Sequence, residues 1–269
     1  SDVVYADIRY YDEIEGHIAK ADIVFALAAQ IHVDRSIHFP QETVDINVKG
    51  TMNVLEACKK YDKKMIFAST SEVYGTTQTE DIAESHPLDG QSPYAASKTA
   101  GDRMCKAYWD TFGTEVVILR NFNVFGPWQN DTSYGSVISI FTRAALLGEP
   151  LKIFGDGSQE RDYMYVDDAV KAYDICATID VYGEPINVGS GETVKIIDLA
   201  NKIIELTESQ SEIIHVEPRA GEVQRLCANI EKAKSLGFVS ETDFDRDLAK
   251  YVVWYKKNIL PRLLLEQEK

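Results

Sequence analysis

Lys64-Met65-Ile66-Phe67-Ala68, followed directly by Ser69-Thr70-Ser71-Glu72-Val73-Tyr74-Gly75, is the stretch that decides the predicted fold. Its first part is a short, largely apolar run, which is typical of a buried strand. Hydroxyl groups and a carboxylate follow this run. Open α/β sheets bind their ligands at the carboxyl ends of their strands. A turn or a helix cap would explain one or two such polar residues, but a whole cluster favours a binding site.

A second stretch, Ser92-Pro93-Tyr94-Ala95-Ala96-Ser97-Lys98, predicts the start of an amphipathic helix. Pro93 suits the first turn, because its φ is fixed and its missing N–H would find no partner there. Tyr94 and Lys98 are four residues apart, so they share one face and can contact the same ligand. We expect the Lys98 ammonium to lower the pKa of Tyr94, which could then exchange a proton with a hydroxyl group. Such a pair also occurs by chance on helix surfaces, and its combination with the polar strand end is what favours chemistry.

Strands and helices alternate along the rest of the first half of the chain. Apolar runs predict strands at Asp22–Ala29 and Val116–Leu119, and a helix is expected from Val44 to Tyr61. The Asp22–Ala29 run is too apolar to be half exposed, so we expect both of its faces to be covered. A further strand is expected within Ser1–Arg9. This alternation predicts an α/β fold with a doubly wound parallel sheet.

In the second half of the chain the predicted elements are mostly helices. Helices are predicted at 137–147, 166–178, 196–207 and 245–257, with a strand at Ile186–Val188. We expect two units, a larger domain at 1–126 and a smaller α/β lobe at 127–269. The lobes should be interleaved, because residues of about 163–190 return to the larger one.

Composition limits the partners that the protein can have. The chain has 269 residues, 45% of them hydrophobic, and 28 Lys plus Arg against 43 Asp plus Glu give a formal charge of −15. Such a surface repels nucleic acid and anionic membranes. The four scattered cysteines show neither a metal-binding spacing nor a disulfide framework. The sequence also shows no secretory signal and no apolar segment long enough to span a membrane. We therefore expect a cytoplasmic protein with reduced cysteines and no bound metal.

The polar strand end and the Tyr-x-x-x-Lys helix together resemble the extended short-chain dehydrogenase/reductases that act on nucleotide sugars. Two more stretches resemble the sugar-nucleotide 4,6-dehydratases, above all those of dTDP-glucose. They are Leu27-Ala28-Ala29 with His32-Val33-Asp34-Arg35-Ser36-Ile37, and Gly155-Asp156-Gly157-Ser158-Gln159 with Arg161-Asp162. The resemblance implies a Rossmann-type sheet, bound NAD and a homodimer formed through a helix bundle. The glycine-rich turn of that family is not found near Ser1, so we expect that the first strands are missing and that this is a truncated sequence of a longer protein.

The resemblance also implies where NAD would bind. Asp7 and Ile8 would lie near the adenine, and Leu27, Ala28 and Ala29 under the ribose and diphosphate. The remaining cofactor residues would be Asn47, Ser69, Tyr94, Lys98 and Asn121.

Catalytic roles follow from the same resemblance. Tyr94 would take the proton of the sugar 4-hydroxyl with help from Thr70, and Glu72 would remove the C5 proton before water leaves C6. Ser71 stands where the dTDP-glucose enzymes usually carry an Asp, and Thr-Ser-Glu is also seen in other dehydratases and in UDP-glucuronate decarboxylases. Catalysis is therefore assigned to Thr70, Ser71, Glu72, Tyr94 and Lys98.

The substrate implied is a nucleotide-diphosphate sugar. Its diphosphate would be clamped by Arg161 and Arg219, because guanidinium groups suit phosphate oxygens. His32, Asn123 and Asn187 are further candidate contacts. A 4-epimerase, a UDP-glucuronate decarboxylase and a non-catalytic nucleotide-sugar binder remain alternatives to the dehydratase. Glu72 separates them, because a 4-epimerase needs no base at C5.

Overall fold

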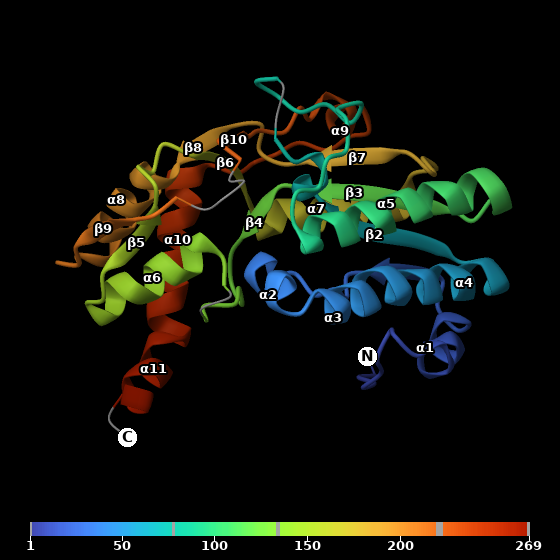
Figure 1. Cartoon of the computed structure of the whole chain (residues 1–269), viewed down its shortest axis with the longest axis horizontal. Coiled ribbons are helices and arrows are strands. Elements are labelled where there is room, and N and C mark those ends of the chain that lie inside the picture. The colour runs from blue at the N-terminus through green and yellow to red at the C-terminus, as the bar shows by residue number, and fades with distance from the viewer. Residues whose placement is uncertain (1, 77–78, 133–134, 219–222, 268–269) are drawn as a thin grey trace.

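The computed structural model describes residues 2–76, 79–132, 135–218 and 223–267. Two lobes lie side by side in it (Figure 1). The larger lobe is built on a four-stranded sheet, and the smaller lobe on two short sheets with the long helix α10 (Phe244–Asn258). The polar strand end found in the sequence belongs to the larger lobe.

The larger sheet is parallel throughout, with strand order β1-β2-β3-β7. Its strands are β1 (Ile23–Ala26), β2 (Lys64–Thr70), β3 (Val116–Asn121) and β7 (Pro185–Val188). Successive side chains of a strand point to opposite faces. Phe67 and Ile118 accordingly belong to one core cluster, and Ile66 and Leu119 to another. The central strands are thus apolar on both faces, as expected for a covered parallel sheet.

Helices cover both faces of this sheet. One face packs against α1 (Tyr11–Ile18), α4 (Thr51–Tyr61) and α5 (Pro93–Phe112). The other packs against α7 (Val166–Thr178) and α9 (Glu231–Ser235). The predicted doubly wound α/β fold is confirmed.

Helix α5 carries the Tyr-x-x-x-Lys stretch and begins as the sequence predicts. The Ser92 hydroxyl accepts a 3.0 Å hydrogen bond from the Ala95 amide, and Pro93 occupies the first turn. Helix α5 crosses close to β2 at Gly101, where an added Cβ would lie 2.9 Å from the Phe67 ring. The helix is therefore held directly against the strand that ends in the polar cluster.

The chain before α4 is more helical than the sequence indicated. Helix α2 (Val33–His38) and helix α3 (Pro40–Val44) lead into a π-helical turn, η1 (Asp45–Gly50), and then into α4. The expected helix start at Val44 was wrong, because Pro40 already supplies a favourable first-turn residue. Turns of the π type are frequent at functional sites, and this one carries Asn47.

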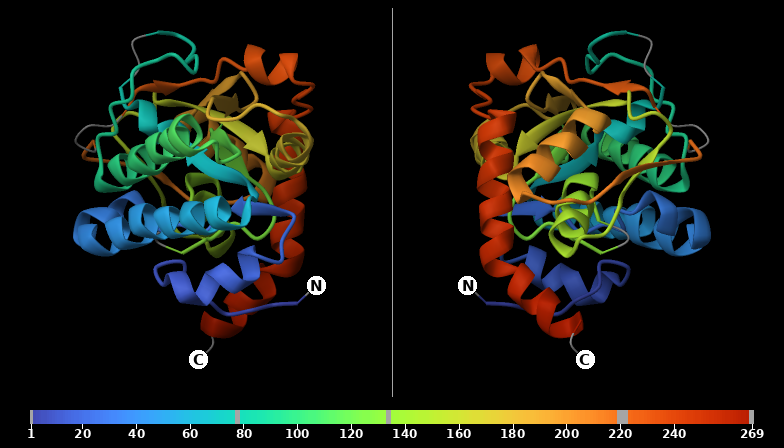
Figure 2. Two further views of the ribbon diagram at one scale, coloured as in Figure 1. Left: turned by 90° about the vertical axis from the view of Figure 1, so that its right-hand side faces the viewer. Right: turned by 90° about the vertical axis from the view of Figure 1, so that its left-hand side faces the viewer.

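The smaller lobe is held together by one large apolar cluster. Strand β6 (Glu160–Tyr165) lies between β4 (Asn123–Phe125) and β10 (Arg225–Leu226) and pairs antiparallel with β8 (Thr193–Lys195). A second pair joins β5 (Leu151–Phe154) and β9 (Ile213–Val216). The lobe's helices are α6 (Val137–Leu147), α8 (Ile196–Thr207), α10 and α11 (Leu260–Gln267), and Figure 2 shows α10 running along one side of it.

The chain crosses between the lobes more than once. Strand β6 leads directly into α7, which packs on the larger sheet, and β7 then pairs with β3 in that sheet. Strand β3 is followed by β4, which pairs with β6 of the smaller lobe. The polar ends of β2 and β3 consequently lie on the side of the larger sheet that faces the smaller lobe.

Two expectations about the N-terminal part were wrong. Residues 2–7 form no strand, and Val3 and Tyr5 are exposed; no strand among the described residues pairs with this segment, and a strand needs such a partner. Strand β1 was expected to be covered on both faces, yet Phe25 is 43% exposed. Within the described chain β1 is an edge strand that pairs with β2 alone.

Candidate active site

The carboxyl end of β2 and the first turns of α5 bring the predicted catalytic residues together. Strand β2 ends at Thr70, and a 3₁₀-helical turn, η2 (Ser71–Tyr74), carries Glu72. The Thr70 hydroxyl accepts a 3.3 Å hydrogen bond from the Glu72 amide, which fixes the start of the turn. The Thr70 side chain is near enough to Tyr94 to lower the pKa of its phenol, and Glu72 is near enough to act on Tyr94 electrostatically. Thr70, Glu72 and Tyr94 therefore form one cluster.

The electrostatics of Tyr94 differ from the expectation. Burial raises the pKa of Tyr94 to about 12, the bond from Thr70 opposes the rise, and the charge of Glu72 adds to it. Lys98 does not contribute, because its Nζ donates to the Ala68 carbonyl and lies 4.4 Å from the centre of the Phe67 ring. The prediction that Lys98 lowers the pKa of Tyr94 was wrong for this structure.

Lys98 itself is strongly affected by its surroundings. Its side chain is buried, and this burial lowers the pKa of Lys98 to about 8, while the nearby Cys105 and Asp102 oppose the fall. The ammonium can thus lose its proton just above neutral pH. Such perturbed groups cluster at functional sites.

Glu72 is the second titratable group that burial affects. Burial raises the pKa of its carboxyl, and the positive charge of Arg161 opposes the rise. Arg161 comes from β6 of the smaller lobe, where its Nη1 donates a 2.9 Å bond to the Glu160 carbonyl. The site is therefore built from both lobes, and a carboxyl with a raised pKa is suited to proton exchange.

Asn47 connects α5 to the loop after β1. Its amide nitrogen donates to the Gln30 carbonyl at 2.8 Å and to the Ser97 hydroxyl at 2.9 Å, and its oxygen accepts from the Gln30 amide at 2.8 Å. Ser97 donates in turn to the Tyr94 carbonyl at 2.7 Å. The Asn47 side chain thus fixes the helix that carries Tyr94.

Two predicted cofactor residues lie at the ends of β2 and β3. The Asn121 amide nitrogen donates to the Ser69 carbonyl at 3.3 Å and to the Tyr173 hydroxyl at 3.0 Å. Its oxygen is buried and has no hydrogen-bond partner in the described part of the chain. A buried acceptor without a partner fits a ligand that donates an N–H. Ser69, in contrast, donates its hydroxyl to Asp102 at 2.8 Å, so its side chain faces α5.

The remaining cofactor candidates follow β1 or precede α1. Leu27 and Ala28 are exposed and Ala29 is half-buried. Asp7 is paired with Arg9 at 2.6 Å, and this bond lowers the pKa of Asp7. Ile8 is held against α4, since the Asn53 side-chain amide donates to its carbonyl at 2.9 Å.

The substrate candidates are placed differently from one another. His32 is half-buried just before α2, and the Asn123 amide donates to the Asp162 carbonyl at 3.2 Å. Asn187 is fully buried, donates to the Ile82 carbonyl at 2.7 Å and accepts from the Tyr74 hydroxyl at 2.6 Å. Its side chain is therefore part of the core, and the expected sugar or diphosphate contact is not what this geometry supports. Arg219 lies outside the described residues.

Comparison with known proteins identifies the family. The model of the "NAD dependent epimerase/dehydratase family" matches residues 2–189. The chain belongs to this family. It is 38% identical over 261 residues to a putative UDP-glucose 4-epimerase of Methanocaldococcus jannaschii, covering 96% of this chain and 85% of that one. It is 34% identical over 258 residues to a dTDP-glucose 4,6-dehydratase of an Actinoplanes species, covering 95% and 80%.

A solved structure agrees with this membership in the epimerase/dehydratase family. DesIV, a dTDP-glucose 4,6-dehydratase from Streptomyces venezuelae with NAD and TYD bound, has a TM-score of 0.90 and 30% identity, covering 95% of this chain and 79% of that one. The predicted family, NAD dependence and Rossmann-type fold are therefore confirmed. The buried Asn121 oxygen, which has no hydrogen-bond partner among the described residues, and the Lys98 ammonium near the end of β2 fit this cofactor.

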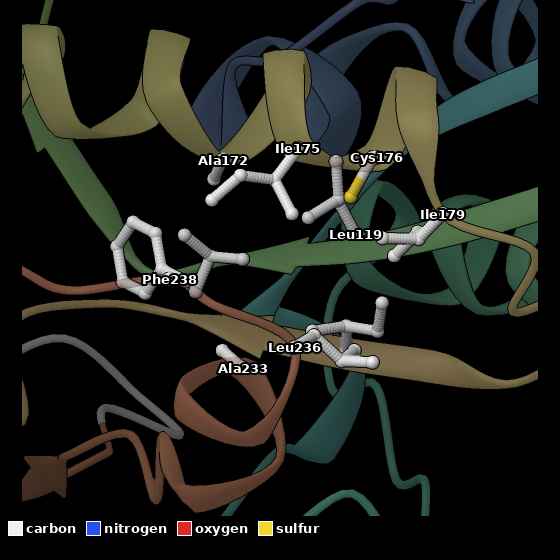
Figure 3. Close-up of a pocket in the computed structure, with 10 residues that line it drawn as sticks. Leu119, Ala172, Ile175, Cys176, Ile179, Ala233, Leu236 and Phe238 are labelled. Carbon is white, nitrogen blue, oxygen red and sulfur yellow. The ribbon is translucent and has the colours of Figure 1, made fainter.

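A small cavity between α7 and strands β3 and β7 is lined by apolar side chains, with the Cys176 thiol as its one polarisable group (Figure 3). Across the described ranges, no group of three or more His, Cys, Asp or Glu side chains is arranged to hold a metal ion. No helix in that part of the chain has the length and apolar character needed to cross a membrane.

Proposed function

We propose that this member of the family is a nucleotide-sugar 4,6-dehydratase. The observation that carries the proposal is the position of Glu72, a carboxyl with a raised pKa beside Tyr94 and opposite Arg161. Oxidation and re-reduction at one carbon require only the tyrosine. Elimination of water also requires a base at the neighbouring carbon, and Glu72 is suited to that task.

Tyr94 and Thr70 act on the sugar 4-hydroxyl. NAD, when bound, supplies the acceptor of the C4 hydride and a positive charge that lowers the pKa of Tyr94. Tyr94 takes the hydroxyl proton, and the Thr70 hydroxyl beside Tyr94 orients both groups. The pKa of about 12 keeps Tyr94 protonated before ligands bind.

Glu72 performs the elimination. A ketone at C4 acidifies the C5 proton, and the Glu72 carboxylate takes it. The C5 electron pair then forms the C5–C6 double bond as the C6–O bond breaks. The Ser71 hydroxyl is too weak an acid to protonate the departing group, so protonated Glu72 returns its proton and water leaves. A carboxyl with a raised pKa is suited to both transfers. C6 would then take back the hydride that was removed from C4, and C5 would take up a proton from solvent, which gives the 4-keto-6-deoxy sugar.

The smaller lobe is proposed to hold the diphosphate of the nucleotide sugar. Arg161 provides a guanidinium group at the site, and Asn123 lies next to β6 in the same sheet. Guanidinium forks bind phosphate oxygens well. Arg219 and His32 remain proposed contacts of the same ligand.

A 4-epimerase is the second candidate, and the 38% identity to a putative UDP-glucose 4-epimerase favours it. A UDP-glucuronate decarboxylase would instead need a cationic group near the C6 carboxylate, and Arg35 is the candidate for it. A pure nucleotide-sugar binder would have no use for Thr70, Glu72, Tyr94 and Lys98 together.

A substrate panel separates these activities. The purified protein is supplied with NAD and with UDP-, dTDP- or GDP-linked hexoses, and the 4-keto-6-deoxy product is followed by its absorbance in alkali. We expect this product from one nucleotide series. Interconversion of gluco and galacto sugars without it would support the epimerase, and release of carbon dioxide from UDP-glucuronate would support the decarboxylase.

We also infer a cytoplasmic homodimer. All four cysteines are buried and free. Val44 and Met52 present exposed apolar side chains on α3 and α4, which could pair with a second copy. Sedimentation should give twice the monomer mass, and a monomer at micromolar concentration would contradict the dimer.

A further inference from the structure

A buried ion pair lies directly behind the candidate active site. The Asp102 carboxylate of α5 accepts two hydrogen bonds from the Arg120 guanidinium of β3, from Nε at 2.9 Å and from Nη2 at 2.8 Å. The side chains of Arg120 and Asp102 are only 2% and 1% exposed. Removing one member of such a pair is strongly destabilising, whereas apolar replacement of the whole pair is often tolerated. Stability alone is therefore a weak reason to bury these charges.

The pair connects the elements that carry the catalytic groups. Asp102 also accepts from the Ser69 hydroxyl of β2 at 2.8 Å. Arg120 donates to the Tyr74 hydroxyl of η2 at 2.9 Å and lies over the Tyr74 ring. Tyr74 donates in turn to Asn187 of β7 at 2.6 Å. One network thus joins α5 to three strands and to the turn that bears Glu72.

The network links two halves of the site. One half is Tyr94 with Lys98 on α5, and the other is Thr70 with Glu72 at the end of β2. Asp102 stands one turn after Lys98 and two turns after Tyr94 on the same face of α5, so all three side chains face the sheet. Ser69 directly precedes Thr70, and Tyr74 ends the turn that begins after Thr70. A shift of α5 along β2 would break the bonds of Asp102 and separate Tyr94 from Thr70 and Glu72.

We propose that Asp102 is a positioning residue, which acts through Arg120 and Ser69 to hold Tyr94 and Lys98 in register with Thr70 and Glu72. The proposal rests on the proposed function, because it assigns the two halves of the site to one reaction. Asp102 touches neither substrate nor reacting atoms. It also faces Lys98, whose pKa it raises against the effect of burial. The groups around the Lys98 ammonium are Asp102 and Cys105 of α5, and the Phe67 ring and Ala68 carbonyl of β2.

Asp102→Asn tests the proposal, with Asp168→Asn as its matched control. Asp168 is likewise buried, and it accepts hydrogen bonds from Ser240, Glu241 and Thr242 in the segment before α10. In Asp102→Asn we expect kcat to fall about 10- to 100-fold with KM changed less than about threefold, because small displacements of catalytic groups carry costs of this size. Asp168→Asn should lose stability but keep kcat.

Two further readouts do not depend on turnover. The Lys98 amine is titrated by NMR in protein labelled with ¹⁵N-lysine, with Lys98→Met to assign its signal. Asp102→Asn should move this titration to lower pH than in the parent, and amide hydrogen exchange should accelerate in the first turns of α5 more than elsewhere. If the parent turns over no sugar, the proposed function fails, while these two measurements still test the role of Asp102.

Arg120→Lys covers the case in which Asp102→Asn does not fold. It keeps both charges but replaces the planar fork with a point charge. We expect kcat to fall about tenfold while the Lys98 titration stays in place. Unchanged kcat in a folded Asp102→Asn or Arg120→Lys protein would overturn the proposal and leave the pair a purely structural one.

Discussion

The backbone amide of Tyr94 donates a 3.0 Å hydrogen bond to the side-chain hydroxyl of Ser36, fifty-eight residues earlier in the chain. Ser36 is fully buried in α2 and donates its own proton to the Val33 carbonyl at 2.6 Å. The first turn of α5 is therefore fixed from one side by α2, and from the other by the Thr70 contact.

Ser36→Ala should loosen the start of α5. A buried hydrogen bond contributes about 0.5–1.5 kcal/mol, and we expect a stability loss near that size together with a several-fold fall in kcat. Ser209→Ala is the control, since the Ser209 hydroxyl donates to the Ala145 carbonyl in the smaller lobe. Equal kcat in the two variants would show that the Ser36 contact does not orient Tyr94. Urea unfolding and steady-state kinetics supply both values.

Tyr94→Phe removes the phenol that takes the 4-hydroxyl proton. We expect kcat to fall by about 10²- to 10⁴-fold, the usual contribution of general acid–base catalysis, while the Kd for nucleotide sugar stays within a few-fold. Tyr251→Phe is a matched control, because the buried Tyr251 hydroxyl has no hydrogen-bond partner in the described chain. A Tyr94→Phe protein with parental kcat would remove Tyr94 from the reaction.

Lys98 gives the stability a defined dependence on pH. Burial lowers its pKa from 10.5 to about 8, so between these values the unfolded chain binds more protons than the folded one. The contribution of Lys98 to stability therefore rises as pH increases from about 8 to 10.5, and it is unfavourable below that window. Lys98→Met should raise the free energy of unfolding at pH 7 by up to about 3 kcal/mol, while activity is lost. Urea unfolding at pH 7 and pH 10 tests this. A loss of stability at pH 7 would contradict the assigned burial cost.

Leu119 tests the packing between α7 and the sheet. It is fully buried and lines the cavity of Figure 3. Leu119→Ala enlarges this cavity, and we expect the free energy of unfolding to fall by about 2–5 kcal/mol. Leu265→Ala, at an exposed position of α11, should change it little. If Leu119→Ala lowers the free energy of unfolding by less than about 1 kcal/mol, α7 and the larger sheet move together and fill the enlarged cavity.

The helices of the smaller lobe show how far local sequence determines structure. Helices α6, α7 and α8 begin and end at the predicted residues. Their apolar periodicity and the residues at their ends are local features of the sequence, so no distant contact is needed to predict them. The polar end of β2 and the start of α5 were predictable for the same reason. Residues 2–7 have strand-like composition, but none of the described strands pairs with them, and no local pattern reveals this.

The errors in the site all concern contacts between distant segments. Tyr94 and Lys98 do share a helix face, but the Lys98 ammonium donates its hydrogen bond to the Ala68 carbonyl. Burial is then the largest effect on the pKa of Tyr94. Asn187 follows a predicted strand, yet its bond to Tyr74 appears only when β7 joins the sheet. Asp102 and Arg120 were missed because nothing in either local sequence marks a pair that forms across α5 and β3.

Enzyme-bound NADH in Glu72→Gln tests the central claim most directly. The variant keeps Tyr94 and Thr70 but lacks the base at C5, so oxidation at C4 remains possible and elimination does not. The variant is supplied with a saturating concentration of the nucleotide hexose that gives product with the parent protein. We expect protein-bound NADH to accumulate, seen as absorbance at about 340 nm, and no 4-keto-6-deoxy product to form. Product formation by Glu72→Gln at the parental rate would contradict the assignment of Glu72 as the base and, with it, the proposed dehydratase.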